Sequence, residues 1–421
     1  MELQAPPSSS RQMSPDGGGI RRSGSCDFLV VGAGVVGVTV SRELHRRYGG
    51  RVLVIDKEPS PGMHASGRNS GVLHAGVYYP PNSLKARLCI EGNRRMREYC
   101  ASKKLPINRA GKVIVARGPE DLPGLEELHR RATANGVQVA WLDAKALHEV
   151  EPHARTLEKA LYVKETAVVE PSRVMESLVN DAKAEGVEFE FNCAWEGLRG
   201  DRSAQTRHGT IAFGHLVNCA GLFADRVAHA FGVGREYGIL PFRGGYYRLN
   251  PQSVVHVRGN IYPVPDLRNP FLGVHFTRRP NGEVTVGPTA LPLLGREQYS
   301  GLKGVNATDA LSMGSYMFRL FTQNRDHFRS LAVKEIGKMT KKGFYREAAG
   351  LVDGLEPHDL APGESAGIRA QLVNIRTAEL LNDFVVEPGP RSTHVLNAVS
   401  PAFTSSLPFA EHVVQTMKLD I

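Results

Sequence analysis

The sequence has few cysteines and no long hydrophobic stretch. Only five cysteines occur among 421 residues, without a CxxC pair or a local Cys/His cluster. A disulfide framework or a zinc site is therefore not expected. No uninterrupted apolar run approaches the roughly 18 residues of a membrane-spanning helix, so the chain is not expected to cross a bilayer. Internal repeats and long low-complexity linkers are also lacking.

The overall composition is that of a folded protein. Hydrophobic residues make up 41% and charged residues 23% of the chain, which excludes wholesale disorder. The 44 glycines and 26 prolines predict many tight turns. The net charge of +9 is compatible with nucleic acid, a membrane surface, an anionic ligand or an organelle, and by itself selects none of them.

The first 26 residues differ from the rest of the chain. They are rich in Pro, Ser, Gly and Arg and lack hydrophobic periodicity. The segment is interpreted as a disordered or targeting segment. Its slight basic excess resembles a mitochondrial signal, but it has no amphipathic helix and no apolar core of a secretory signal.

A glycine-rich turn follows the first ordered segment. Residues 28–31 form an apolar run that predicts a buried parallel strand, and residues 38–48 predict a helix. Between them the chain has the pattern G-x-G-x-x-G at residues 32–37. A second apolar strand, 51–55, ends at Asp56. Together, the glycine pattern, the two strands and the acid at the end of the second strand predict a dinucleotide-binding site.

Each residue of this motif has a physical role in such a site. Gly32 permits the tight turn, Gly34 lets the backbone approach a pyrophosphate, and Gly37 lets helix and strand pack closely. The helix N-terminus offers free N–H groups and positive potential to phosphates. Asp56 can accept hydrogen bonds from a ribose diol.

The loop after Asp56 favours FAD as the dinucleotide. Small residues at 65–67 and 70–71 permit close approach to a second phosphate and to a flat ring. His74 and the pair Tyr78-Tyr79 follow in the same loop.

Several further motifs carry a family resemblance. They are segments 56–58, 67–79, 83–89, 218–225, 241–247, 259–266, 270–277, 366–371 and 397–406. In these segments the chain resembles the L-2-hydroxyglutarate dehydrogenases, a family within the D-amino-acid-oxidase-like FAD oxidoreductases. The resemblance extends over about residues 27–416, is loose over 295–355, and departs from the family pattern at Ser365, where a proline is expected.

The resemblance implies an α/β fold of two intertwined domains. One is an FAD-binding Rossmann-like domain of the glutathione-reductase/D-amino-acid-oxidase type, expected at 27–100, 166–230 and 362–421. The other is a mixed-sheet α+β substrate domain, expected at 101–165 and 231–361. Sequence patterns add helices at 84–103, 124–135, 144–150, 172–185 with Ser172 as N-cap, and from about 406, and strands at 110–116, 161–169, 187–191, 211–218, 247–249 and 283–286.

The same resemblance and the glycine motif together give an expected FAD site. Its members are backbone or small side-chain positions, with Asp56 and Lys57 as exceptions. The expected cofactor-binding residues are Gly32, Gly34, Val36, Gly37, Asp56, Lys57, Ser66, Asn69, Ser70, Gly71, Ala220, Gly221, Ser400, Ala402, Thr404 and Ser405.

The implied reaction oxidises the C2 alcohol of a 2-hydroxy diacid, with hydride transfer to the flavin. A histidine is the expected base for the hydroxyl proton, and His74 is preferred over His275, although the family match does not decide between them. Two substrate carboxylates call for cationic or multi-donor anchors. The expected anchors are Arg243, Arg369, Tyr79, Tyr246 and Lys85.

Alternatives remain open at this level. An amino-acid or amine oxidase on the same scaffold would also need carboxylate-binding arginines. A nucleic-acid-binding flavoprotein is motivated only by the net charge, because the basic residues are scattered. The expected location is mitochondrial, with possible peripheral membrane contact. The electron acceptor, a quinone or an electron-transfer protein, is unidentified, and so are the oligomeric state and the choice between dehydrogenase and oxidase.

Overall fold

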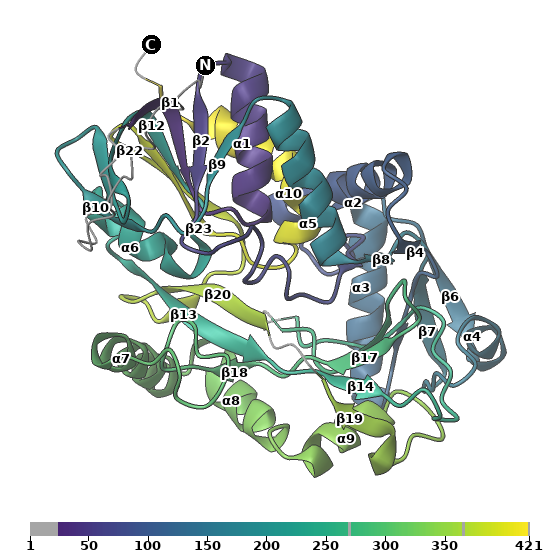
Figure 1. Ribbon diagram of the computed structural model, residues 1–421. Helices are drawn as coiled ribbons and strands as arrows, with labels where there is room; N and C mark the ends of the chain where they lie inside the picture. Colours follow the sequence, from purple (N-terminus) through teal and green to yellow (C-terminus); the bar gives the residue numbers. More distant parts are fainter. Residues whose placement is uncertain (1–23, 268–270, 364–366, 420–421) are drawn as a thin grey trace, which may run out of the picture.

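The computed structural model describes residues 24–267, 271–363 and 367–419. Two layered bodies face each other in Figure 1, one around the strands at the top and one around the strands below. The chain passes between them several times, so that purple, teal and yellow segments lie together in the upper body.

The upper body contains a mostly parallel sheet. Its strand order is β10-β11-β12-β1-β2-β9, and β23 joins β12 on one side and β22 on the other. β1 pairs in parallel with both β2 and β12, as expected for strands buried on both faces. The strands are β1 (Gly24–Val31), β2 (Val52–Ile55), β9 (Glu188–Glu190), β10 (Trp195–Leu198), β11 (Ser203–Thr206), β12 (Gly209–Asn218), β22 (Val385–Gly389) and β23 (Ser392–Asn397).

Helices cover one face of this sheet and strands curl over the other. Alternate residues of β1 point to opposite sides, so Phe28 and Val30 join one core and Leu29 and Val31 another. The first core is closed by α1 (Val35–Tyr48), α2 (Leu84–Ser102), α5 (Pro171–Ala184) and α10 (Ala402–Thr416). The second lies under β10–β12 and the short α6 (Ala224–Ala230).

The turn from β1 to α1 is possible only with glycine at two positions. Gly32 has φ +107°, and a Cβ there would lie 2.5 Å from the carbonyl oxygen of Cys219. A Cβ on Gly37 would lie 1.8 Å from the carbonyl oxygen of Gly32. The glycines therefore bring α1 directly against the end of β1, as the motif predicts.

The lower body is built on an eight-stranded mixed sheet. Its order is β19-β14-β17-β16-β15-β5-β7-β6. Its strands come from three parts of the chain: β5 (Lys112–Val115), β6 (Val139–Asp143), β7 (Lys159–Val163), β14 (Tyr247–Leu249), β15 (Asn260–Pro263), β16 (His275–Arg278), β17 (Val284–Gly287) and β19 (Leu360–Pro362). Helices α3 (Leu122–Ala134), α4 (Ala144–Val150) and α9 (Lys341–Ala349) pack around it.

Two smaller sheets join the bodies. One has the order β18-β13-β20-β21, from β13 (Tyr237–Gly244), β18 (Leu291–Pro292), β20 (Gly367–Asn374) and β21 (Glu379–Leu380). The other pairs β8 (Ala167–Val169) with β3 (Val72–Leu73) and β4 (Ile107–Asn108). β20 follows the expected boundary at 362 but pairs with β13, and the chain returns to the first sheet only at β22.

Most of the expected elements are confirmed, but several of their ends are wrong. β1 begins at Gly24 rather than at 28, because residues 24–26 pair with β12 and so are not part of a disordered segment. α1 begins at Val35 rather than at 38, and the expected strand 161–169 is divided into β7 and β8, which belong to different sheets.

Ser172 is not an N-cap: α5 begins at Pro171 after Glu170, because the fixed φ of proline favours the first helical position. The last helix begins at Ala402 rather than near Ser406.

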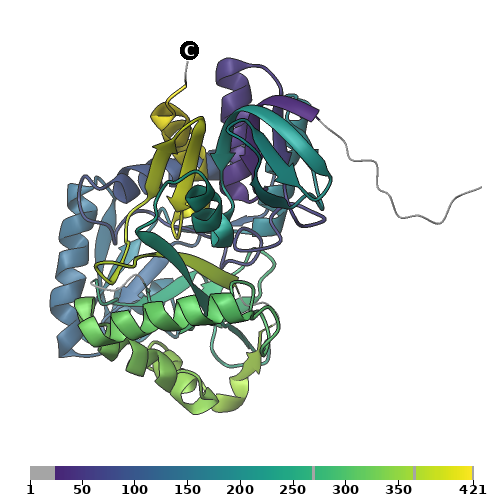
Figure 2. The same cartoon turned by 90° about the vertical axis from the view of Figure 1, so that its left-hand side faces the viewer.

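Three helices in the loosely matching segment were not expected from sequence patterns. They are α7 (Ala307–Gln323), α8 (Phe328–Gly337) and α9, and both cartoon views place α7 and α8 on the lower outer side of the molecule (Figures 1 and 2). Among the described residues, no helix is both long and apolar enough to span a membrane. Ser365 and nearly all of segment 1–26 lie outside the described residues.

Candidate active site

A cavity of about 910 Å³ runs between the two bodies. At one end it is lined by the glycine turn and the loop that follows Asp56. At the other end it reaches the second sheet and the β13–β20 pair. A cavity of this size that is lined by a glycine turn suits a dinucleotide together with a small molecule.

The glycine end has the donors and the free space that a pyrophosphate needs. α1 begins directly after Gly34, which has no side chain to cap the helix. The Oγ of Ser66 accepts from the Val35 N–H at 2.9 Å, and a Cβ on Gly34 would lie 3.1 Å from that Oγ. The N-terminus of α1 is thus open to the cavity and held against the loop.

Asp56 stabilises the turn as well as lining the cavity. One carboxylate oxygen accepts from the Ala33 N–H at 2.6 Å and the other from the Glu58 N–H at 2.9 Å. The side chain therefore ties the glycine turn to the following loop, and either oxygen keeps a lone pair for a ribose hydroxyl.

Nearly all expected site residues line this one cavity. The residues outside its lining are Gly37 and Gly71, which shape the backbone, and Ser405 and Arg243. Nη1 of Arg243 donates to the carbonyl oxygen of Tyr299 at 3.3 Å. The structure thus brings 19 of the 23 expected site residues together, although they come from widely separated parts of the chain.

Two buried histidines lie at the far end. His74 follows β3, and its backbone N–H donates to Oγ1 of Thr404 in the first turn of α10. His275 lies on β16 and stacks on Tyr262, with ring centroids 3.8 Å apart. Burial, the largest cause, lowers the pKa of both imidazoles to about 3, so both are neutral at neutral pH.

The tautomer of His275 follows from its hydrogen bond. Its Nδ1 lies 2.9 Å from the carbonyl oxygen of Gly273. A carbonyl oxygen can only accept, so Nδ1 carries the proton and Nε2 has the free lone pair. Nδ1 of His74 has no hydrogen-bond partner among the described residues.

Two cations, Arg369 on β20 and Lys85 on α2, line the same cavity. Arg369 donates through Nε to Oε1 of Gln371 at 3.1 Å, and its guanidinium lies 5.1 Å from the ring of Phe271. Burial lowers the pKa of Arg369 to about 10, still well above neutral. Lys85, at the start of α2, is also buried, and burial followed by the charge of Arg369 lowers its pKa to about 7.

Two tyrosines line the cavity as well. Burial raises the pKa of Tyr79 well above its usual value, and burial raises that of Tyr246 to about 12. Both therefore remain protonated hydroxyl donors. Together with Arg369 and Lys85 they give this end of the cavity donors for carboxylate oxygens.

Sequence reasoning assigned no site role to Tyr78, which it noted only as part of the loop, to Tyr262 in the cavity wall or to Lys112 behind them. Lys112 lies within a strand that was expected from its apolar residues. A lysine within an apolar strand indicates a functional position, because lysine is almost never fully buried without a partner.

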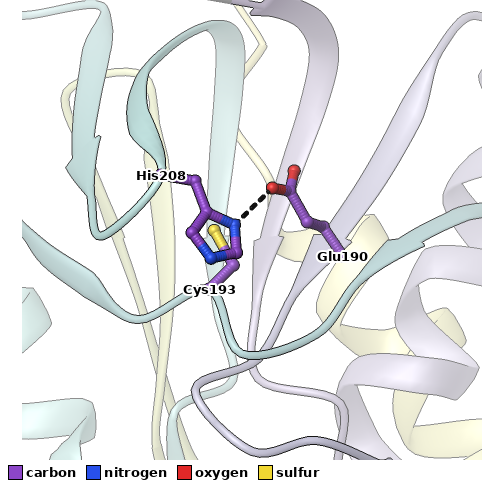
Figure 3. A group of neighbouring side chains, drawn as sticks. All are labelled: Glu190, Cys193 and His208. Carbon is purple, nitrogen blue, oxygen red and sulfur yellow. Dashed lines mark hydrogen bonds and ion pairs between the residues drawn. The ribbon is translucent and has the colours of Figure 1, made fainter. Parts of the chain in front are cut away.

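The fold also creates a cysteine–histidine cluster that the sequence does not show. Cys193, Glu190 and His208 meet where β9 ends beside the β11–β12 turn (Figure 3). Nδ1 of His208 lies 2.7 Å from Oε1 of Glu190. Burial raises the pKa of the Cys193 thiol, which disfavours the thiolate form that a metal ion would bind. The cluster is therefore interpreted as a polar contact between strands.

A second cluster joins the two bodies beside the cavity. Nε2 of His64 lies 2.9 Å from Glu58 and 3.1 Å from Glu297, and its Nδ1 lies 2.7 Å from the hydroxyl of Tyr299. The ammonium of Lys57 bridges the same two carboxylates. Lys57 already supplies the cation here, so the cluster holds the loop after β2 against the loop around residue 297.

Comparisons with known proteins agree with this arrangement. Residues 27–416 match the family model of FAD dependent oxidoreductases. The chain is 35% identical over 398 residues to L-2-hydroxyglutarate dehydrogenase of Escherichia coli strain K12, which covers 93% of each chain. It is 34% identical over 408 residues to the human mitochondrial L-2-hydroxyglutarate dehydrogenase, which covers 91% of this chain and 86% of the human one.

Solved structures share the fold at low sequence identity. The chain matches a Mycoplasma pneumoniae L-alpha-glycerophosphate oxidase with FAD bound, with a TM-score of 0.73, 20% identity, and coverage of 93% of this chain and 94% of that one. It also matches glycine oxidase of Geobacillus kaustophilus, with a TM-score of 0.68, 18% identity, and coverage of 94% and 96%.

Proposed function

The chain belongs to the L-2-hydroxyglutarate dehydrogenase family of FAD-dependent oxidoreductases, and from this we propose that it oxidises L-2-hydroxyglutarate to 2-oxoglutarate. The observation that carries the proposal is the far end of the cavity, whose lining holds neutral histidines together with cationic and tyrosine donors. A 2-hydroxy diacid needs one group to take its hydroxyl proton and others to hold its carboxylates.

The cofactor site fits FAD. The glycine turn, the open N-terminus of α1 and the loop through Ser66, Asn69 and Ser70 would hold the pyrophosphate and ribose, and Ser400, Ala402 and Thr404 lie further along the cavity. Bound FAD would supply the acceptor for the hydride from C2.

The protein side of the reaction divides between two groups of residues. Arg369, Lys85, Tyr79 and Tyr246 would orient the diacid, with a charge-assisted fork from Arg369 to one carboxylate. A histidine would take the hydroxyl proton. His275 is favoured for this step, because its Nδ1 donates to Gly273 and its basic Nε2 is free. Negative charge on the bound substrate would raise the low pKa of the histidines toward neutrality.

An anaerobic titration tests the function. L-2-hydroxyglutarate should bleach the flavin absorbance near 450 nm, whereas the D enantiomer should not, since only one C2–H can face the ring. Bleaching by amino acids but not by L-2-hydroxyglutarate would contradict the proposal and favour the amine-oxidase alternative. Reoxidation by a quinone analogue and by oxygen then separates dehydrogenase from oxidase.

Substitution of each histidine by glutamine tests the assignment of the base. His275→Gln should keep FAD and lower kcat at least about 100-fold, because a positioned base contributes about that much. It should also abolish the acid limb of the kcat profile, which reports the enzyme–substrate complex, while His74→Gln retains that limb. The opposite pattern would assign the base to His74.

The two arginines give a matched pair for substrate binding. Arg369→Met should raise KM at least about tenfold, because a charge-assisted bond to a carboxylate is lost. Arg243→Met should leave KM within about threefold of the wild type, since Arg243 is outside the cavity lining and bonds to the Tyr299 carbonyl. Equal effects of the two substitutions would contradict this division.

We also propose that the protein contacts membranes peripherally through α7 and α8. Large apolar side chains on this surface are exposed, among them Leu311 at 76%, Phe318 at 69% and Ile336 at 62%. Residues 302–342 contain eight Lys and Arg but only three Asp and Glu. Asp309 and Glu335 are buried in ion pairs, and the partner of Glu335 is the buried Lys338, so seven cations remain exposed on this surface. Exposed apolar groups with surrounding cations fit an anionic lipid surface, where the acceptor could be a quinone.

Liposome co-sedimentation tests this contact. Wild-type protein should bind vesicles with 30% phosphatidylglycerol more than vesicles of phosphatidylcholine alone. Phe318→Ser combined with Ile336→Ser should lose at least half of that binding, because apolar area supplies much of interfacial affinity. Val254→Ser is the control, since Val254 is 63% exposed outside this surface. Unchanged binding by the double variant would rule out this surface.

A mitochondrial location stays part of the proposal. The eukaryotic relatives are named as mitochondrial, whereas bacterial relatives are about equally similar. N-terminal sequencing of the native protein would show whether the basic segment 1–26 is removed.

A further inference from the structure

A lysine is buried in the sheet directly behind the histidines. Lys112 lies on β5 and is 1% exposed. In register it pairs with Asn260 of β15, which in turn pairs with Thr277 of β16. Cross-strand partners share a face, so these three side chains form one row on the face that also carries Tyr262 and His275. That face is the one directed toward the cavity.

The ammonium of Lys112 contacts the back of the cavity wall. Its Nζ lies 4.2 Å from the ring centroid of Tyr78 and 5.1 Å from that of Tyr262, and both tyrosines line the cavity. Nζ has no hydrogen-bond partner among the described residues. Aromatic faces are thus its main favourable contacts, and its charge is one ring away from the cavity.

Within residues 24–267, 271–363 and 367–419, no carboxylate acts on Lys112 as a compensating anion. The titratable groups that face it are His74, Tyr78, Cys89, Tyr262 and His275, from α2, β15, β16 and the loop after β3. Burial raises the pKa of the Cys89 thiol to about 12, so it stays uncharged like the others. Burial lowers the pKa of Lys112 itself to about 7.

Lys112 is not alone in lacking a partner. Nδ1 of His74, the hydroxyl of Tyr78 and Oδ1 of Asn260 are also buried without hydrogen-bond partners among the described residues. Unpaired buried polar groups destabilise a fold, and an apolar residue would pack better at such a position. Groups kept in this state beside a cavity are typical of a functional site rather than of a stabilised core.

The charge of Lys112 acts on both candidate bases. After burial, it is the next cause that lowers the pKa of His74, and it also lowers that of His275. Arg369 and Lys85 act elsewhere: neither of them is among the causes that perturb the two histidines. Lys112 is therefore the cation associated with the proton-removing end, while Arg369 and Lys85 serve the carboxylates.

We propose, building on the oxidation proposed above, that Lys112 is a positioning residue whose ammonium charge stabilises the negative charge forming on the substrate C2 oxygen. In that step the O–H bond breaks and the proton passes to a histidine nitrogen. The electron pair of the O–H bond becomes the second C–O bond as the hydrogen on C2 leaves with its pair to the FAD. Because the Lys112 ammonium is already fixed behind the cavity wall, it does not have to reorient as the negative charge on the C2 oxygen develops.

Substitution by methionine, which has similar length and no charge, tests the role. Lys112→Met should lower kcat for L-2-hydroxyglutarate at least about tenfold with KM within about threefold. Because the lysine itself loses its proton as the pH rises, wild-type kcat should fall on the alkaline side and the variant should lack this limb. FAD content should be unchanged, and the melting temperature should equal or exceed that of the wild type, since an unpaired buried charge is gone.

Controls separate this role from a structural one. Lys159→Met on the neighbouring strand β7 removes a lysine that pairs with Glu126 outside the site, and it should leave kcat and the pH profile unchanged. Lys112→Gln repeats the test if the methionine variant does not fold. A kcat within threefold of the wild type, a retained alkaline limb, or a loss of activity matched by loss of FAD and a lower melting temperature would overturn the proposal. A wild type inactive on L-2-hydroxyglutarate would instead overturn the proposed function.

Discussion

The close contact between Gly37 and the Gly32 carbonyl is the constraint on which the rest of the structure depends. No side chain fits between helix α1 and the end of β1 at this point. Because α1 begins directly after this turn, the free N–H groups of its first residues face the cavity. Ser66 and Asp56 hold the loop and the turn in place through hydrogen bonds. The position of the cofactor end, and hence of everything beyond it, follows from this turn.

Beyond the turn, the cavity gathers charged and polar groups in a place where water is scarce. Burial keeps His74 and His275 neutral and lowers the pKa of Lys85 and Lys112 to about 7. These groups reduce the stability of the fold, since charges are poorly solvated there. The same environment strengthens their interactions with a charged substrate, which is why such groups are useful in a catalytic cavity.

Elements with local signals could be predicted from the sequence, and elements defined by tertiary contacts could not. The strand–turn–helix at residues 28–48 has its own periodicity and glycines, so it was correctly placed. Helix α8 was missed because its exposed face carries Val333 and Ile336, which obscure an amphipathic pattern. Ser172 was mistaken for a cap because Pro171 starts α5 instead.

The sequence by itself determined the dinucleotide motif, the family and 19 of the residues that line the cavity, because these depend on spacing and residue type. The tertiary structure alone decided which arginine reaches the cavity, since Arg369 and Arg243 lie in equally compact contexts along the chain. It alone fixed the tautomer of His275 through Gly273, and it alone placed Lys112 behind the tyrosines. Such facts arise from pairing between distant strands, and no local pattern encodes the partner of a strand.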